Sequence, residues 1–149
     1  MPTPNPHRLN RDVVPSAYRL AIDSDLDAGT FGGTVAVTAT VERSTDTIVC
    51  NAAGLDVTSA TVRVGDDTHE PRVELDAATE RLLLHLDAPL PTGDIELDLS
   101  FRGEFAALLV GYYRSTYEHD GDVASIGVTQ FEAPYARRAF PCWDEPDFK

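Results

Sequence analysis

Apolar and polar residues alternate along much of this chain with a period of two, as in strands that bury one face. In residues 34–42, TVAVTATVE, one face would carry Val35, Val37, Ala39 and Val41. In residues 94–101, DIELDLSF, one face would carry Ile95, Leu97, Leu99 and Phe101. We therefore predict two long strands whose aliphatic faces line a core.

Shorter apolar runs predict further strands, and clusters of Gly, Asp, Pro and Thr separate them as turns. The runs are YRLAI (18–22), DTIVC (46–50), TVRV (61–64), RVEL (72–75) and RLLLHL (81–86). No window combines helix caps with a 3.6-residue apolar stripe over three turns. Many short strands about ten residues apart are typical of an antiparallel sandwich, so we predict one all-β domain over residues 1–149.

Composition narrows the possible partners. The 149 residues are 42% hydrophobic, with no apolar run long enough to cross a membrane and no apolar secretory stretch at the start. We therefore expect a soluble, cytoplasmic protein with no membrane partner. Asp and Glu number 25 against 12 Lys and Arg, a net charge of -13. Nucleic acid is also negative, so it is excluded from the expected partners.

The cysteines and histidines offer little metal chemistry. Cys50 and Cys142 could form one disulfide, but nothing else in the sequence indicates an oxidising compartment, and we favour two buried free thiols. The four histidines, His7, His69, His85 and His119, are far apart and none is paired with a cysteine at ligand spacing. No metal site is predicted within this chain.

The final stretch, TQFEAPYARRAFPCWDEPDFK (129–149), is the most distinctive part of the sequence. If VTQFEA continues as a strand, Gln130 and Glu132 share one face and Phe131 points the other way. A carboxylate beside an amide oxygen suits an ammonium group, because one supplies charge and the other a further acceptor. Such a pair is also common on a wet strand face, so spacing alone leaves its role open.

Other charged pairs in this stretch have simpler interpretations. Asp144 and Glu145 could be a pair of glycosidase carboxylates, but neighbours beside Pro146 are better explained as fixing a loop. Arg137 and Arg138 could bind an anion, although in so acidic a chain we expect them to pair with its own carboxylates. We interpret Phe131, Ala139, Phe140, Pro141, Cys142 and Trp143 as packing residues.

This stretch resembles the signature in the N-terminal domain of the zinc aminopeptidases typified by aminopeptidase N and puromycin-sensitive aminopeptidase. VVPSAYRLAIDSDLDAGTFGGTVAV, LDVTSATV and GYYRSTY, in that order, extend the resemblance over nearly the whole chain. The resemblance implies a saddle-like β-sandwich packed beside a thermolysin-like catalytic domain. That domain would bind zinc through H-E-x-x-H and a distant glutamate, and would carry Gly-x-Met-Glu-Asn.

None of those catalytic motifs occurs in this sequence. We therefore expect the chain to be a fragment, inactive alone, with bare apolar surface where its own catalytic domain would pack. By resemblance, Glu132 would bind the free α-amine of a peptide substrate and Gln130 would lie near the first side-chain pocket. The intact protein would remove N-terminal residues from peptides. The alternative is a stand-alone acidic β-sandwich binding module without catalysis.

Overall fold

The computed structural model describes residues 8–148, which form ten strands and two short 3-10 turns. This range contains no α-helix, as the absence of helix signals predicted, and no helical segment long and apolar enough to cross a membrane. The strands are β1 (Val13–Asp25), β2 (Thr30–Val41), β3 (Thr45–Asn51), β4 (Leu55–Val64), β5 (Asp67–His69), β6 (Arg72–Asp76), β7 (Arg81–Leu90), β8 (Gly93–Glu104), β9 (Gly111–His119) and β10 (Asp122–Gln130). The 3-10 turns are η1 (Ala136–Arg138) and η2 (Pro146–Phe148).

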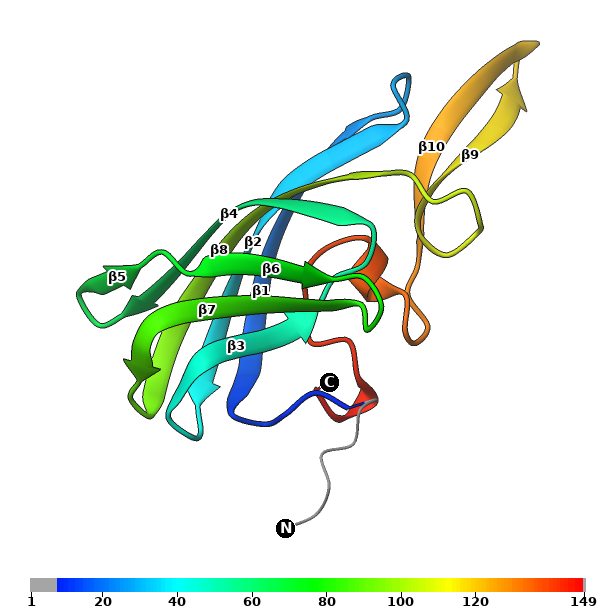
Figure 1. The fold of residues 1–149 in the computed structure, drawn as a ribbon. Helices are drawn as coiled ribbons and strands as arrows, with labels where there is room; N and C mark the ends of the chain where they lie inside the picture. Colours follow the sequence, from blue (N-terminus) through cyan, green and yellow to red (C-terminus); the bar gives the residue numbers. More distant parts are fainter. Residues whose placement is uncertain (1–7, 149) are drawn as a thin grey trace.

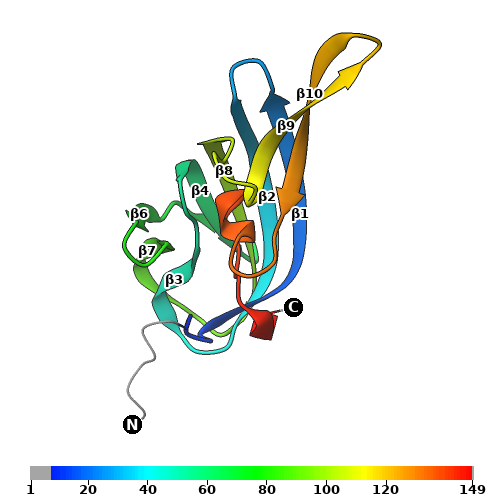
Figure 2. The same cartoon turned by 90° about the vertical axis from the view of Figure 1, so that its right-hand side faces the viewer.

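The strands form two facing sheets and a projecting hairpin (Figure 1). The larger sheet has the order β1-β2-β8-β4-β5 and the smaller one β3-β7-β6, and every pairing within them is antiparallel. Figure 2 shows the layers edge-on, with β3, β6 and β7 on one side and β1 and β2 on the other. The predicted all-β antiparallel sandwich is confirmed.

The two long alternating strands pair with each other in the middle of the larger sheet. Val35 of β2 lies opposite Leu99 of β8, and Val37 lies opposite Leu97. All four side chains are buried, so both apolar faces point into the sandwich as predicted. The five shorter predicted strands lie within β1, β3, β4, β6 and β7.

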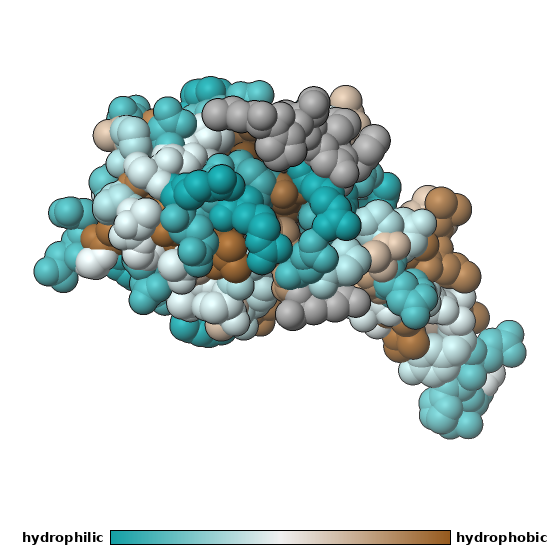
Figure 3. All heavy atoms as spheres, turned by 90° about the horizontal axis from the view of Figure 1, so that it is seen from below, coloured by the Kyte–Doolittle hydropathy of each residue, from teal (hydrophilic) through white to brown (hydrophobic). Residues whose placement is uncertain are grey.

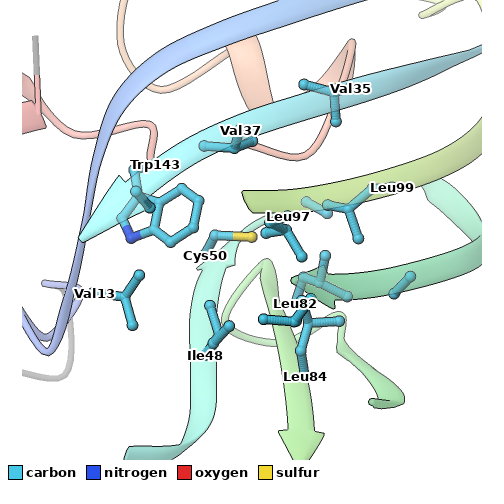
Figure 4. Close-up of a cluster of buried hydrophobic side chains, with 14 of the residues drawn as sticks. Val13, Val35, Val37, Ile48, Cys50, Leu82, Leu84, Leu97, Leu99 and Trp143 are labelled. Carbon is cyan, nitrogen blue, oxygen red and sulfur yellow. The ribbon is translucent and has the colours of Figure 1, made fainter. Parts of the chain in front are cut away.

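The core combines side chains from both sheets and from the C-terminal stretch. Figure 4 shows Val37 and Leu97 facing Ile48 and Leu82, with the indole of Trp143 in the same cluster. Trp143 is only 5% exposed although it lies outside every strand. The stretch after β10 therefore contributes to the core through Trp143.

The β9–β10 hairpin, which we call the arm, was not predicted as a unit. Its two strands join through Asp120 and Gly121, whose φ angles of 52° and 85° suit a two-residue turn of the primed type. The sequence alternation is weak because neither face of β10 is buried along its length. At its base, Tyr112 shares a 2.7 Å hydrogen bond with Ser24, and Arg114 Nη1 donates to the Leu26 carbonyl at 2.7 Å.

Leu97→Ala should lower the free energy of unfolding by about 2–5 kcal/mol, because it empties space between the two sheets. Leu109→Ala is the matched control, since that side chain is 72% exposed and its loss should change stability by less than about 0.5 kcal/mol. Urea titration of both variants measures the difference. Equal shifts in the two midpoints would contradict the two-sheet core.

Candidate functional site

The stretch after β10 runs back across the sandwich and is bonded to the end of β3. Asn51 N donates to the Cys142 carbonyl at 2.8 Å, and Cys142 N donates to the Asn51 carbonyl at 3.0 Å. The Asn51 side-chain oxygen accepts from Asp144 N at 3.2 Å. Asn51 is itself buried, so this short antiparallel bridge fixes the stretch inside the fold.

Arg137 holds this loop closed through an ion pair with Asp144. Its Nε and its backbone N both donate to Asp144 Oδ2 at 3.1 Å, and its Nη2 donates to the Asp144 carbonyl at 3.1 Å. The two side chains are each only 11% exposed. The expectation that Arg137 and Arg138 pair with carboxylates of the chain is confirmed for Arg137 by Asp144. It is confirmed for Arg138 by its ion pair with Glu80.

Both arginines also reach Glu80, which the sequence did not single out. Arg137 Nη1 lies 3.2 Å from one Glu80 carboxylate oxygen, and Arg138 Nη2 lies 2.9 Å from the other. Glu80 ends the β6–β7 turn with a φ angle of 53°. Asp76 shapes that turn, because its carboxylate accepts from Thr79 Oγ1 at 2.6 Å.

The two adjacent carboxylates after Trp143 are used to fix loops, as predicted. Asp144 is bound to Arg137 as described, and a Glu145 oxygen accepts from Leu9 N at 2.6 Å. Arg8 forms an ion pair with Asp147 two residues later. These contacts join the N-terminal segment to the C-terminal stretch.

The thiols of Cys50 and Cys142 are free and buried, as predicted. Burial raises the pKa of the Cys50 thiol from its ordinary value of 9.0 to about 12, and raises that of Cys142 as well. Nearby, burial also raises the pKa of Tyr18, whose hydroxyl accepts from Trp143 N at 3.1 Å. All three groups are neutral at physiological pH and serve packing.

The predicted strand through Gln130 and Glu132 is wrong beyond Gln130. Gln130 pairs with Gly111, where β9 begins, so the next residues have no partner strand. Glu132 lies in the turn that follows, two residues before Pro134, whose ring restricts Ala133 and removes a backbone donor. The two side chains therefore do not share a strand face by alternation.

Both side chains are nevertheless exposed on this short segment. Neither forms a hydrogen bond or an ion pair with another residue of 8–148. Phe131 between them is half-buried and packs edge-on against Phe140, with ring centres 6.0 Å apart. Phe140 in turn contacts Tyr18 at 6.2 Å. These ring contacts join the segment to β1 through Tyr18, and Phe140 and Phe131 pack as predicted.

A broad hollow lies elsewhere, between the tip of the β1–β2 hairpin and the arm. It has a volume of about 1550 Å³, with Phe31 and Leu55 in its lining. Carboxylates dominate its charged lining: Asp23, Asp25, Asp27, Asp56 and Glu104. On β10 it reaches only Val123–Ser125, so Gln130 and Glu132 are not part of it.

Exposed apolar side chains are concentrated near the arm. Leu108, Leu109 and Val123 are each more than 70% exposed, and Ile126 is 45% exposed. Figure 3 shows a mostly hydrophilic body, with hydrophobic atoms gathered on the side where the arm leaves it. Apolar surface is thus exposed beside the arm, and its packing against a catalytic domain stays a prediction.

Metal ligands do not gather in residues 8–148, where no three His, Cys, Asp or Glu side chains lie close enough to hold an ion. His85 contacts Glu74 and Thr47 on neighbouring strands, and His119 lies beside Asp120. His7 and Lys149 lie outside the described residues.

Comparison with known proteins identifies the relatives of this chain. Residues 14–149 match the family model of the peptidase M1 N-terminal domain. Aminopeptidase M1 of Arabidopsis thaliana is 43% identical over 147 residues, which cover 95% of this chain and 17% of the plant protein. Aminopeptidase N of Rattus norvegicus is 33% identical over 159 residues, which cover 97% of this chain and 16% of the rat protein. The chain thus spans about one sixth of the length of these relatives.

Both thiols should react slowly with a disulfide reagent in the folded chain at pH 8 and rapidly in urea. Burial keeps the reagent away from the sulfur atoms, and it also disfavours the reactive thiolate form. An unfolded thiol loses its proton near pH 9.0, whereas folded Cys50 keeps it up to about pH 12. The free energy of unfolding should therefore fall as the pH rises above about 9. Fast labelling of the folded chain would contradict the burial of the thiols.

Proposed function

The chain belongs to the peptidase M1 N-terminal domain family, and we propose from that premise that it serves an aminopeptidase as its N-terminal domain. The complete enzyme removes N-terminal residues from peptides. This domain forms one wall of the active-site cleft and helps to bind the α-amine of the substrate. The residues proposed for that contact are Gln130 and Glu132.

The observation that carries the proposal is the free carboxylate of Glu132. It has no partner in residues 8–148, while the nearby Arg137, Arg138 and Asp144 are all paired with each other or with Glu80. A peptide ammonium leaving water needs a charged, hydrogen-bonding partner, because an unpaired buried charge is strongly destabilising. Glu132 offers that charge on a segment held by the contact between Phe131 and Phe140.

Gln130 supports the same contact from the last position of β10. Its side chain is exposed two residues before Glu132, and its backbone is paired with Gly111. A primary amide both donates and accepts hydrogen bonds, so it suits the first peptide unit or side chain of a substrate. The strand end positions the amide, and the turn positions the carboxylate.

Hydrolysis itself belongs to a catalytic domain beside this one. No zinc site is formed by the described residues, so no step of the reaction is assigned to zinc within this chain. In the complete enzyme, zinc held by the catalytic domain would polarise the scissile carbonyl and activate water. The exposed apolar residues near the arm, Leu108 and Leu109 among them, are proposed to pack against that domain.

The second candidate is a stand-alone acidic binding module. The 1550 Å³ hollow with its five carboxylates is the observation that favours it, because such a surface suits a basic partner. The sequence that follows this chain in the reading frame of its gene distinguishes the aminopeptidase from the binding module. An H-E-x-x-H motif downstream in the same protein supports the aminopeptidase, whereas a folded protein without that motif supports the binding module.

In the full-length enzyme, Glu132→Ala should lower kcat/KM roughly thirty-fold to several thousand-fold. Removing one member of a desolvated charge pair costs about 2–5 kcal/mol, and about 1.4 kcal/mol is tenfold. Gln130→Ala should cost on the order of 1 kcal/mol, because it removes a hydrogen bond without a charge. Steady-state kinetics on one aminoacyl substrate measures both effects.

Glu118→Ala is the matched control, since Glu118 is an exposed carboxylate further out on the arm. It should leave kcat/KM unchanged. Zinc content should be equal in all three variants, which separates lost recognition from lost metal. Wild-type efficiency in Glu132→Ala would remove Glu132 from the amine site.

A chelator should abolish the activity of the full-length enzyme and leave the fold of this domain intact, because the core is built from apolar contacts between two sheets. The purified chain should bind no stoichiometric zinc and cleave no aminoacyl substrate. Metal analysis, circular dichroism and a fluorogenic assay test these outcomes together. Stoichiometric zinc with turnover in the isolated chain would contradict the division between two domains.

A further inference from the structure

We propose that Glu80 is a positioning residue for the segment that carries Gln130 and Glu132. Glu80 lies in the β6–β7 turn of the smaller sheet, 50 residues before Gln130 along the chain. It acts through the two arginines of η1 and contacts neither site residue. The inference rests on the proposed amine-binding role of Glu132, and it extends that role to a residue on the smaller sheet.

Glu80 is fixed at its own end by the backbone. Its carbonyl accepts from Ala52 N at 3.1 Å and from Asn51 Nδ2 at 3.3 Å. Its φ angle of 53° places it in the left-handed region, which shapes the direction of the carboxylate. The carboxylate therefore leaves a rigid corner between β3 and β7.

From that corner the carboxylate holds both η1 arginines at once. One oxygen accepts from Arg138 Nη2 at 2.9 Å and the other from Arg137 Nη1 at 3.2 Å. Arg137 has a second carboxylate partner in Asp144. Within residues 8–148, Glu80 is the only carboxylate paired with Arg138, and Arg138 Nε is buried without a partner. Arg138 therefore depends on Glu80 more than Arg137 does.

Arg138 transmits the position of Glu80 to the base of the arm. A Cβ built on Gly111 would lie 2.6 Å from Arg138 Cβ, so the Arg138 side chain leaves the backbone directly against that glycine. Gly111 has a φ angle of 68° and pairs with Gln130 across the arm. The route from Glu80 to Gln130 thus needs only two intermediate residues, Arg138 and Gly111.

The turn with Glu132 is held between the same supports. It joins Gln130 at the end of β10 to η1, which contains both arginines. Arg138 N donates to the Tyr135 carbonyl at 3.2 Å, and Ala53 N donates to the Arg137 carbonyl at 2.9 Å. When the arginines lose their contacts with Glu80, the turn between Gln130 and η1 is held less firmly at both of its ends. The Glu132 carboxylate then samples more positions and binds an ammonium less often.

The test is Glu80→Gln in the full-length enzyme, because glutamine keeps the size of the side chain and replaces one acceptor by donors that face the arginines. A displacement of about 1 Å at a binding group can lower a rate about a hundredfold, so we expect kcat/KM to fall roughly five- to fifty-fold. The loss should appear mainly in KM. Glu74→Gln is the matched control, since Glu74 pairs with Arg72 and His85 in the same sheet.

A double-mutant cycle and amide exchange complete the test. Once Glu132 is Ala, adding Glu80→Gln should lower kcat/KM by less than twofold, because the positioned carboxylate is already gone. In the Glu80→Gln single variant, the amide hydrogens of Ala53 and Arg138 should exchange faster than in wild type. In Glu74→Gln, the same two amide hydrogens should exchange at the wild-type rate.

The outcomes separate this inference from the proposed function. Unchanged exchange in Glu80→Gln overturns the positioning role, whatever the kinetics. Faster exchange with fully additive losses in the cycle also overturns it, because Glu80 would then act independently of Glu132. Faster exchange with a non-additive loss supports it. If Glu132→Ala alone retains wild-type efficiency, the proposed amine site is wrong. The positioning role of Glu80 is then overturned as well, even if amide exchange is faster in Glu80→Gln.

Discussion

Two sheets of unequal width face each other in this fold. Part of the apolar inner face of the larger sheet is therefore not covered by the smaller sheet, and other segments must pack on it. The larger sheet has five strands and the smaller has three. At one end the C-terminal stretch closes the gap with Trp143. At the other, Phe105 just after β8 and Tyr112 at the base of the arm pack against Phe31. Apolar area left in water would cost roughly 25 cal/mol per Å². Covering that face therefore fixes the path of the chain after β8.

Charge then fixes the finer geometry of the closing stretch. Arg137 and Asp144 are both almost buried, and such a pair is retained only when hydrogen bonds replace the lost water. The guanidinium meets this condition through two oxygens of Asp144 and one of Glu80. Each of these bonds has a direction, whereas apolar packing has none. Burial brings the stretch to the core, and the ion pairs decide which side chains remain free outside it.

Sequence patterns predicted the parts of this fold that depend on burial of one face. β2 and β8 were predicted because their alternating residues are buried on one side and wet on the other. The arm was missed because neither of its faces is fully buried, so its residues carry no strong period. Gln130 and Glu132 were proposed first from their spacing and then from the resemblance, but the strand expected to contain both ends at Gln130, which pairs with Gly111 at the start of β9. Glu80 was invisible because its partners lie 57 and 58 residues away in the sequence.

The arm also leaves strand edges uncovered, which affects how copies of the chain meet. Among residues 8–148, β10 pairs only with β9, and the outer side of β9 has a single bridge, from Tyr113 to Ala106. Open edges beside exposed Val123 and Ile126 form a template for another strand. The net charge of -13 opposes such pairing, because two approaching copies repel each other. That repulsion reaches about 10 Å at 0.1 M salt and only about 3 Å at 1 M. Concentrated salt therefore removes the long-range barrier that keeps the arms of separate molecules apart.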